Sequence, residues 1–114
     1  RMLAMNRGEV WWVQFDPSIG SEIRKRRPGI ILSNSVANQH LSRVVVVPIT
    51  SNVDRVYPSE ALISVTGKAA KAMADQIMAA DKSRLDGRMA TLSREDLAAV
   101  EQAVKLHLGM SPNT

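Results

Sequence analysis

The sequence predicts a mainly β or α+β domain: a small, twisted or barrel-like antiparallel sheet followed by one C-terminal helix. Segments rich in β-branched and aromatic residues come first along the chain, and such residues favour the half-buried surface of a sheet. A convincing helical periodicity comes last, over residues 92–108. Strands first and a helix last favour this architecture.

The apolar segments predict four strands, over residues 9–15, 29–33, 44–49 and 60–65. The third is the most apolar and is expected at the centre of the sheet. A long polar loop joins the first two strands, and its length exceeds the roughly 2 to 5 residues usual for a hairpin. This length hints at a function for the loop.

Two further segments are less regular. Residues 34–43 are interpreted as a polar connection anchored by Val36 and Leu41. Residues 73–80 form another apolar run, interrupted at Asp75 and Gln76.

The C-terminal helix carries its own start and stop signals. Ser93 is expected to cap it, with Asp96 as a shorter stand-in for the glutamate of a capping box, and Leu92 with Leu97 matches a hydrophobic staple. Gly109 and Pro112 end the pattern. The expected apolar face comprises Leu97, Val100, Val104 and Leu108.

The length of 114 residues fits one domain. This domain is expected over residues 6–110, with 1–5 and 111–114 as termini and Met5 as the apparent start. The absence of cysteine excludes a disulfide framework, a thiolate zinc site and a cysteine nucleophile. The sequence shows neither a membrane span nor a signal-peptide core, so a cytoplasmic protein without a membrane partner is expected.

Positive charge is concentrated in the first half of the chain. The net charge is +4 and the pI is about 10.0, which favours an anionic partner. Between residues 24 and 57 the only anion is Asp54, whereas the cations are Arg24, Lys25, Arg26, Arg27, Arg43 and Arg55. A polyanion site is therefore expected in this half.

The densest part of this charge, residues 24–27, runs directly into Pro28 and a predicted strand. A charge block fixed at a strand is suited to binding phosphates. The alternative is an ordinary solvated loop, which is the common role of a charge run taken alone.

Several short clusters at strand ends, taken in order, carry a family resemblance. They are Gly20-Ser21-Glu22 with Arg27-Pro28, Asn34, Pro48-Ile49-Thr50-Ser51, Asp75-Gln76-Ile77 and Asp81-Lys82-Ser83-Arg84-Leu85. In this order and spacing the chain resembles the MazF/PemK family of toxin endoribonucleases, from Arg7 through the helix after Leu92.

The resemblance implies a homodimer of small SH3-like antiparallel β-barrels with a C-terminal helix, restrained by a cognate antitoxin protein. It implies sequence-specific cleavage of single-stranded RNA without a metal or other cofactor, which would inhibit translation and growth. The 2′-hydroxyl attacks the adjacent phosphate and leaves a 2′,3′-cyclic phosphate and a 5′-hydroxyl. The family's catalytic arginine and threonine correspond to Arg27 and Thr50.

The chemistry of this step agrees with those two residue types. Attack on a phosphodiester builds negative charge on the non-bridging oxygens, which one guanidinium can meet with two parallel hydrogen bonds. The hydroxyl of Thr50 can add a neutral donor. Glu22 is a candidate acceptor of the 2′-hydroxyl proton, although neighbouring arginines would weaken it as a base. The equal alternative is that Glu22 pairs with a neighbouring cation.

The expected RNA-binding residues are Ser21, Arg24, Lys25, Arg26, Asn34, Ser51 and Gln76. Each has a simpler alternative, since Asn34 and Ser51 also suit turns and Gln76 suits a backbone partner. His40 and His107 have no carboxylate at a suitable spacing, so neither a histidine base nor a metal site is expected.

Two other functions remain as alternatives. One is a toxin of the same fold that poisons DNA gyrase, since one fold supports several activities. The other is a basic module that binds single-stranded nucleic acid without chemistry, which the charge asymmetry alone would support.

Overall fold

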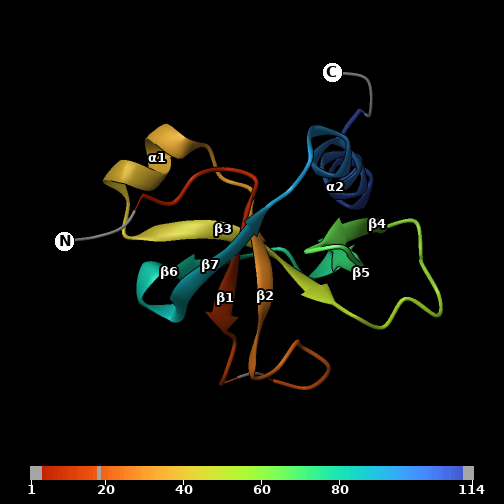
Figure 1. Ribbon diagram of the computed structural model, residues 1–114, viewed down its shortest axis with the longest axis horizontal. Helices are drawn as coiled ribbons and strands as arrows, with labels where there is room; N and C mark the ends of the chain where they lie inside the picture. The colour runs from red at the N-terminus through yellow and green to blue at the C-terminus, as the bar shows by residue number, and fades with distance from the viewer. Residues whose placement is uncertain (1–3, 18, 112–114) are drawn as a thin grey trace.

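The computed structural model describes residues 4–17 and 19–111. Within them the strands form a strongly curved 7-stranded sheet in the order β4-β5-β3-β2-β1-β7, with β6 also pairing to β3. All pairs are antiparallel. The strands are β1 (Glu9–Gln14), β2 (Arg26–Ile31), β3 (Arg43–Thr50), β4 (Glu60–Val65), β5 (Lys68–Met73), β6 (Met78–Asp81) and β7 (Leu85–Thr91). The curled sheet and the helix that follows it (Figure 1) confirm the predicted fold class.

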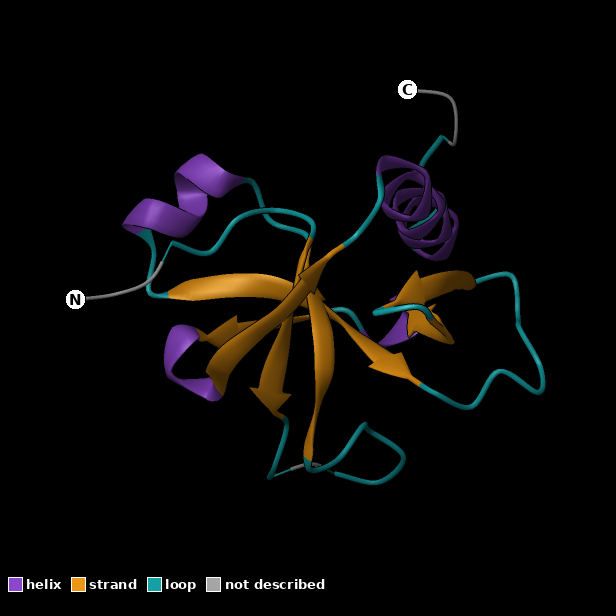
Figure 2. Ribbon diagram, in the orientation of Figure 1, coloured by secondary structure: helices purple, strands orange, loops and turns teal. Residues whose placement is uncertain are grey.

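In the described part of the chain the sheet is accompanied by two α-helices and two short 3-10 helices, drawn in purple in Figure 2. These are α1 (Ser35–His40), η1 (Ala74–Gln76), η2 (Lys82–Arg84) and α2 (Arg94–His107). Helix α2 packs against β4 and η1. None of the helices in the described part of the chain is long and apolar enough to cross a membrane.

Both faces of the central strands are buried. Successive side chains of a strand point to opposite faces, so Ile30 joins a core cluster with Val47 and Val100 of α2. Its neighbour Ile31 joins a second cluster with Val46. Strands β2 and β3 are thereby held from both sides, which gives the residues at their ends a rigid base.

The predicted second strand, 29–33, is displaced in the structure. β2 begins at Arg26 and ends at Ile31, because Arg26 and Arg27 pair with Gln14 and Val13 of β1. The two arginines therefore belong to the sheet rather than to the loop.

Three strands were not predicted as strands from the sequence, although β6 falls largely within the apolar run at 73–80. The polar, alanine-rich segment of β5 pairs along its whole length with β4, while β6 and the polar β7 pair with β3 and β1. The apolar run at 73–80 is divided between the end of β5, η1 and β6. These segments become strands because a neighbour supplies their hydrogen bonds.

The prediction of a polar connection over residues 34–43 was wrong. The segment contains α1, and its supposed anchors Val36 and Leu41 are 68% and 55% exposed. The buried residue is Asn38, whose side-chain amide donates to Met5 O (2.9 Å) and Ser33 O (3.1 Å). A polar side chain fixes this helix because it satisfies buried carbonyl groups.

The C-terminal helix was predicted well at its start. The backbone amide of Asp96 donates to Ser93 Oγ at 3.1 Å, which confirms the cap. The Asp96 carboxylate does not complete a capping box, because it accepts a hydrogen bond from Ser64 N of β4 (2.9 Å). Leu108 was wrongly placed on the apolar face, since it is 54% exposed, and Ala103 lies in the core.

Candidate functional site

The four consecutive cations, residues 24–27, stand at the end of a loop, residues 15–25, whose two ends are joined by hydrogen bonds. The amide of Phe15 donates to Lys25 O (2.8 Å), and the amide of Lys25 donates to Asp16 Oδ1 (3.1 Å). The Phe15 side chain is buried. The loop projects from the bottom of the sheet in Figure 1, so the cations that follow it have a defined position.

Arg27 and Thr50 are brought to the same face of the sheet. The last register pair between β2 and β3 is Gly29 with Pro48, and beyond it Ile49 and Thr50 of β3 pair with β5. Residues opposite one another in antiparallel strands project to the same side. Because side chains alternate along each strand, Arg27 and Thr50 lie on the same side as Gly29 and Pro48, two residues away. These are the two side chains that the family resemblance predicts as catalytic.

Both groups retain hydrogen-bonding capacity. Arg27 Nε donates to Arg24 O (3.3 Å), and neither of its terminal nitrogens has a hydrogen-bond partner among the described residues. Thr50 Oγ1 accepts a hydrogen bond from Asn52 N (3.3 Å), which leaves its own hydrogen to donate. The arrangement provides a guanidinium fork and a neutral hydroxyl for one anionic group.

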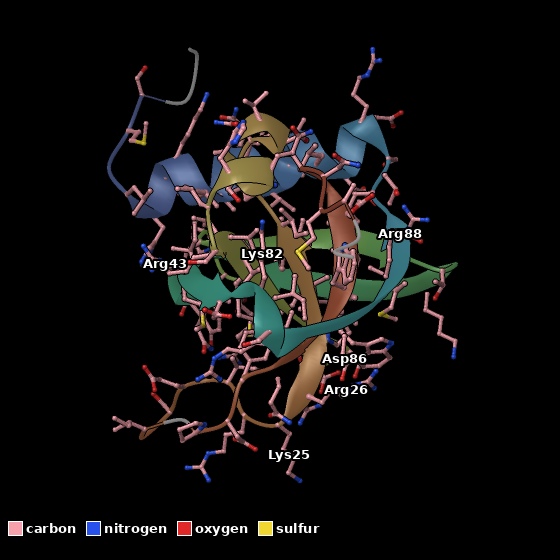
Figure 3. The ribbon with its side chains drawn as sticks, turned by 90° about the vertical axis from the view of Figure 1, so that its left-hand side faces the viewer. Lys25, Arg26, Arg43, Lys82, Asp86 and Arg88 are labelled. Carbon is pink, nitrogen blue, oxygen red and sulfur yellow. The ribbon has the colours of Figure 1, made fainter. Side chains whose placement is uncertain are left out.

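Arg26 is held differently from its neighbours. It forms an ion pair with Asp86 (2.8 Å), and its guanidinium lies over the Trp12 ring, 4.4 Å from the centroid. Figure 3 shows Arg26 beside Asp86, whereas Lys25 projects away below them. Part of the charge of Arg26 is therefore already neutralised within the protein.

A hollow of about 350 Å³ lies beside Trp12 and Arg26. Its polar lining includes Arg26, Arg27, Ser51, Thr66 and Lys68. Lys68 adds a cation that the sequence gave no reason to select. Ser51 lines this hollow together with Arg27, whereas Thr50 is not among the lining residues.

Glu22 and Gln76 lie together in a second hollow, of about 260 Å³. Glu22 Oε1 accepts a hydrogen bond from Ile19 N (2.7 Å), and Gln76 Oε1 accepts one from Ile23 N (2.7 Å). Among the described residues Glu22 forms no ion pair with a cation, and its role as acceptor of the 2′-hydroxyl proton stays a prediction. Each of these two side chains therefore holds a backbone amide of the 15–25 loop through a hydrogen bond.

The remaining predicted contacts are divided. Ser21, Arg24 and Lys25 are exposed on the loop, and Arg24 Nη2 donates to Gly20 O (3.1 Å). Asn34 is separate from them: its Oδ1 accepts a hydrogen bond from Ala37 N (2.7 Å) and caps α1. Helix α1 lies at the far end of the molecule from the loop (Figures 1 and 3). The structure therefore does not bring Asn34 to the site.

A buried ion pair behind Thr50 was missed. Lys71 of β5 is the register partner of Thr50, is 9% exposed, and forms an ion pair with Glu60 (3.0 Å). Its position in an alanine-rich polar segment gave no signal of burial. The pair stands at the base of the loop 51–59, which begins directly after Thr50.

The histidines stand on helices, His40 in α1 and His107 at the end of α2. Among the described residues no group of three or more histidine, aspartate or glutamate side chains is placed to hold a metal ion. The chemistry that these residues themselves provide is cationic and neutral donation to an anion.

Comparisons with known proteins identify the family. Residues 6–108 match the family model of the PemK-like, MazF-like toxins of type II toxin-antitoxin systems. The chain is 39% identical to endoribonuclease MazF9 of Mycobacterium tuberculosis, over 93% of this chain and 98% of that protein.

Solved structures show the same fold. MazF of Deinococcus radiodurans (Form-I) is 28% identical with a TM-score of 0.85, over 96% of this chain and 100% of that one. A MazE-MazF structure (Form-II) from the same organism is 26% identical with a TM-score of 0.77 and the same coverage. The chain therefore belongs to the family of PemK-like, MazF-like toxins of type II toxin-antitoxin systems.

Proposed function

We propose that this toxin is a metal-independent endoribonuclease that cuts single-stranded RNA at specific sequences. The observation that carries the proposal is the projection of Arg27 and Thr50 from adjacent strand ends to one face, with donors available on both. The M. tuberculosis relative is named as an endoribonuclease, and its similarity covers nearly the whole chain.

In the proposed reaction the 2′-hydroxyl oxygen of the substrate forms a bond to the adjacent phosphorus, and the bond to the 5′-oxygen breaks. The 2′-hydroxyl loses its proton and the 5′-oxygen gains one, which leaves a 2′,3′-cyclic phosphate and a 5′-hydroxyl. Arg27 binds the non-bridging oxygens as their charge increases, and Thr50 donates to the same phosphate. Arginine stays protonated, which excludes Arg27 as the base.

The other residues of the site bind or position. Arg24 and Lys25 bind RNA phosphates, Ser21 and Ser51 donate hydrogen bonds at the rims, and Arg26 lines the groove. Glu22 and Gln76 position the 15–25 loop through its backbone amides.

The partners follow from the family and the charge. We propose a homodimer in the cytoplasm, restrained by a cognate antitoxin whose acidic segment covers residues 24–27. Size-exclusion chromatography with light scattering tests the dimer. Co-expression with the neighbouring open reading frame tests the antitoxin. If no neighbouring gene restores the growth of cells that express the toxin, that part of the proposal is contradicted.

The activity is tested by incubating purified protein with cellular RNA in EDTA and mapping the new ends. Cleavage that leaves cyclic phosphates supports the proposal, and Arg27→Ala is expected to abolish it. Arg94→Ala, an exposed arginine on α2, is the matched control. Intact RNA together with trapped DNA gyrase would support the gyrase poison instead, and RNA binding without cleavage would indicate a binding module.

A further inference from the structure

The loop after Thr50 is folded around the Lys71–Glu60 ion pair. Lys71 Nζ donates to Arg55 O (2.7 Å), and Glu60 Oε1 accepts a hydrogen bond from Tyr57 N (2.9 Å). The amide of Glu60 in turn donates to Tyr57 O (2.9 Å). The backbone on both sides of residue 56 is thus tied to one pair whose side chains are only 11% and 10% exposed.

The Lys71–Glu60 ion pair fixes the backbone at Tyr57, whose ring faces solvent. Tyr57 is 52% exposed, whereas the other three aromatic residues, one Phe and two Trp, are buried or half-buried. Phe15 and Trp11 are buried, and Trp12 lies under the guanidinium of Arg26. A large apolar ring that is exposed on a fixed backbone has no packing role to explain it.

Two cations stand beside this ring. The Arg55 guanidinium carbon lies 5.9 Å from the ring centroid and Lys71 Nζ lies 5.8 Å from it. Arg55 Nη1 also donates to Tyr57 Oη (3.3 Å), which fixes the phenol edge. A half-exposed aromatic ring with two cations over it suits a ligand that has both a flat ring and a negative charge.

Lys71 links the ring to the proposed reaction centre. Thr50 and Lys71 are cross-strand partners, so their side chains project from the same face. Ile49, Ala70 and Ala72 project to the opposite face and belong to the core. Since Lys71 connects Thr50 with the Tyr57 ring, a phosphate at Thr50 would place a neighbouring base within reach of that ring.

We propose that Tyr57 is a stacking platform for one nucleobase of the RNA substrate, adjacent to the phosphate bound by Arg27 and Thr50. This inference rests on the proposed ribonuclease function and adds a base-binding subsite to it. The Lys71–Glu60 pair positions the ring, and Arg55 holds its edge and attracts the adjoining phosphate.

The binding test uses a short single-stranded RNA that contains the mapped cleavage site, with hydrogen in place of the 2′-hydroxyl at the cut. If no cleavage is found, a degenerate RNA pool replaces it. Fluorescence anisotropy should show Tyr57→Ala binding about 5- to 150-fold more weakly, the range for loss of one base–aromatic stack. Tyr57→Phe keeps the ring and should bind within about twofold of wild type.

Two controls separate stacking from damage to the loop. Val56→Ala removes an adjacent exposed side chain and should bind as wild type does. RNAs with a single abasic nucleotide should reveal one position where the missing base weakens wild-type binding but has no further effect on Tyr57→Ala. This non-additivity identifies the stacked base.

The inference is overturned if Tyr57→Ala binds as tightly as wild type, if Tyr57→Phe loses as much affinity as Tyr57→Ala, or if no abasic position is non-additive. The ribonuclease proposal fails on a different result, namely the absence of cleavage of all-ribose RNA by wild type. Because the binding assay needs no turnover, each can fail while the other stands.

Discussion

At the scale of single residues, neighbouring arginines in one basic block have different tasks. Arg26 is paired with Asp86 and stacked on Trp12, whereas the terminal nitrogens of Arg27 are available. The importance of Arg27 and Thr50 followed from their positions at strand ends and from the family resemblance. The tasks of Glu22 and Gln76 did not follow, because each binds a backbone amide whose position only the folded loop defines.

Replacing Arg27 by lysine should lower single-turnover cleavage by about 10²- to 10³-fold, the usual cost of losing one transition-state donor. Lysine retains the charge but cannot form two parallel hydrogen bonds to one phosphate. Thr50→Val should reduce the same rate with little change in RNA affinity, since it removes a single neutral donor.

Arg94→Lys is the matched control for the conservative arginine change and should cleave at the wild-type rate. An Arg27→Lys protein as fast as wild type would contradict the role of the guanidinium fork.

At the scale of elements, apolar content predicted β1, β2, β3 and β4 but missed the strands of polar or alanine-rich composition. β5 and β7 are polar or alanine-rich, so no alternation marked them, and their neighbours determine them. Helix α1 was not predicted because the buried residue of this six-residue helix, Asn38, is polar. The 15–25 loop depends on Gln76, which is 53 residues from Ile23 in the sequence.

Gln76→Ala should loosen the 15–25 loop. It leaves the Ile23 amide without its partner, at a cost of about 1–3 kcal/mol if the amide stays buried. Amide hydrogen exchange over residues 19–25 should accelerate and kcat/KM should fall, while the cleavage sequence is unchanged. Gln102→Ala, exposed on α2, is the control. A changed cleavage sequence with unchanged exchange would instead show that Gln76 reads a base.

At the scale of the whole molecule, the net charge of +4 predicts salt-dependent RNA binding. Arg24→Gln and Lys25→Gln should each reduce the slope of log K against log salt by about 0.7, the value for one phosphate contact on a single strand. Replacing Arg26 and Asp86 together by glutamine and asparagine removes a neutral pair and should leave the slope nearly unchanged. If the double change reduced the salt slope more than Arg24→Gln does, the proposal that Arg24 rather than Arg26 contacts a phosphate would be contradicted.

Stability should fall in acid partly through Glu9. Burial raises the pKa of this carboxyl, but hydrogen bonds from Asn6 N, Trp11 and Arg88 outweigh it and bring the pKa below its ordinary value of 4.5. The stabilising contribution is therefore complete above pH 4.5 and is lost as the pH falls through the lower, folded-state pKa.

Urea unfolding at a series of pH values should show a shallower acid decline for Glu9→Gln than for wild type. Asp81, whose pKa is lowered by hydrogen bonds from Ser83, contributes a slope of the same sign that remains in the variant. Identical slopes in the two proteins would show that Glu9 titrates alike folded and unfolded.

The burial of β2 and β3 on both faces has one more consequence. Arg27 and Thr50, the proposed phosphate-binding residues, stand at the ends of these strands. Lys25 and Tyr57 instead belong to loops that contact the core at a few residues. Sequence changes in the loops can therefore alter which bases are accepted without moving the groups that act on the phosphate. Arg27 and Thr50 each share a hydrogen bond with one loop residue, Arg24 and Asn52, so an engineer could diversify the loops while keeping the strands and these two positions fixed.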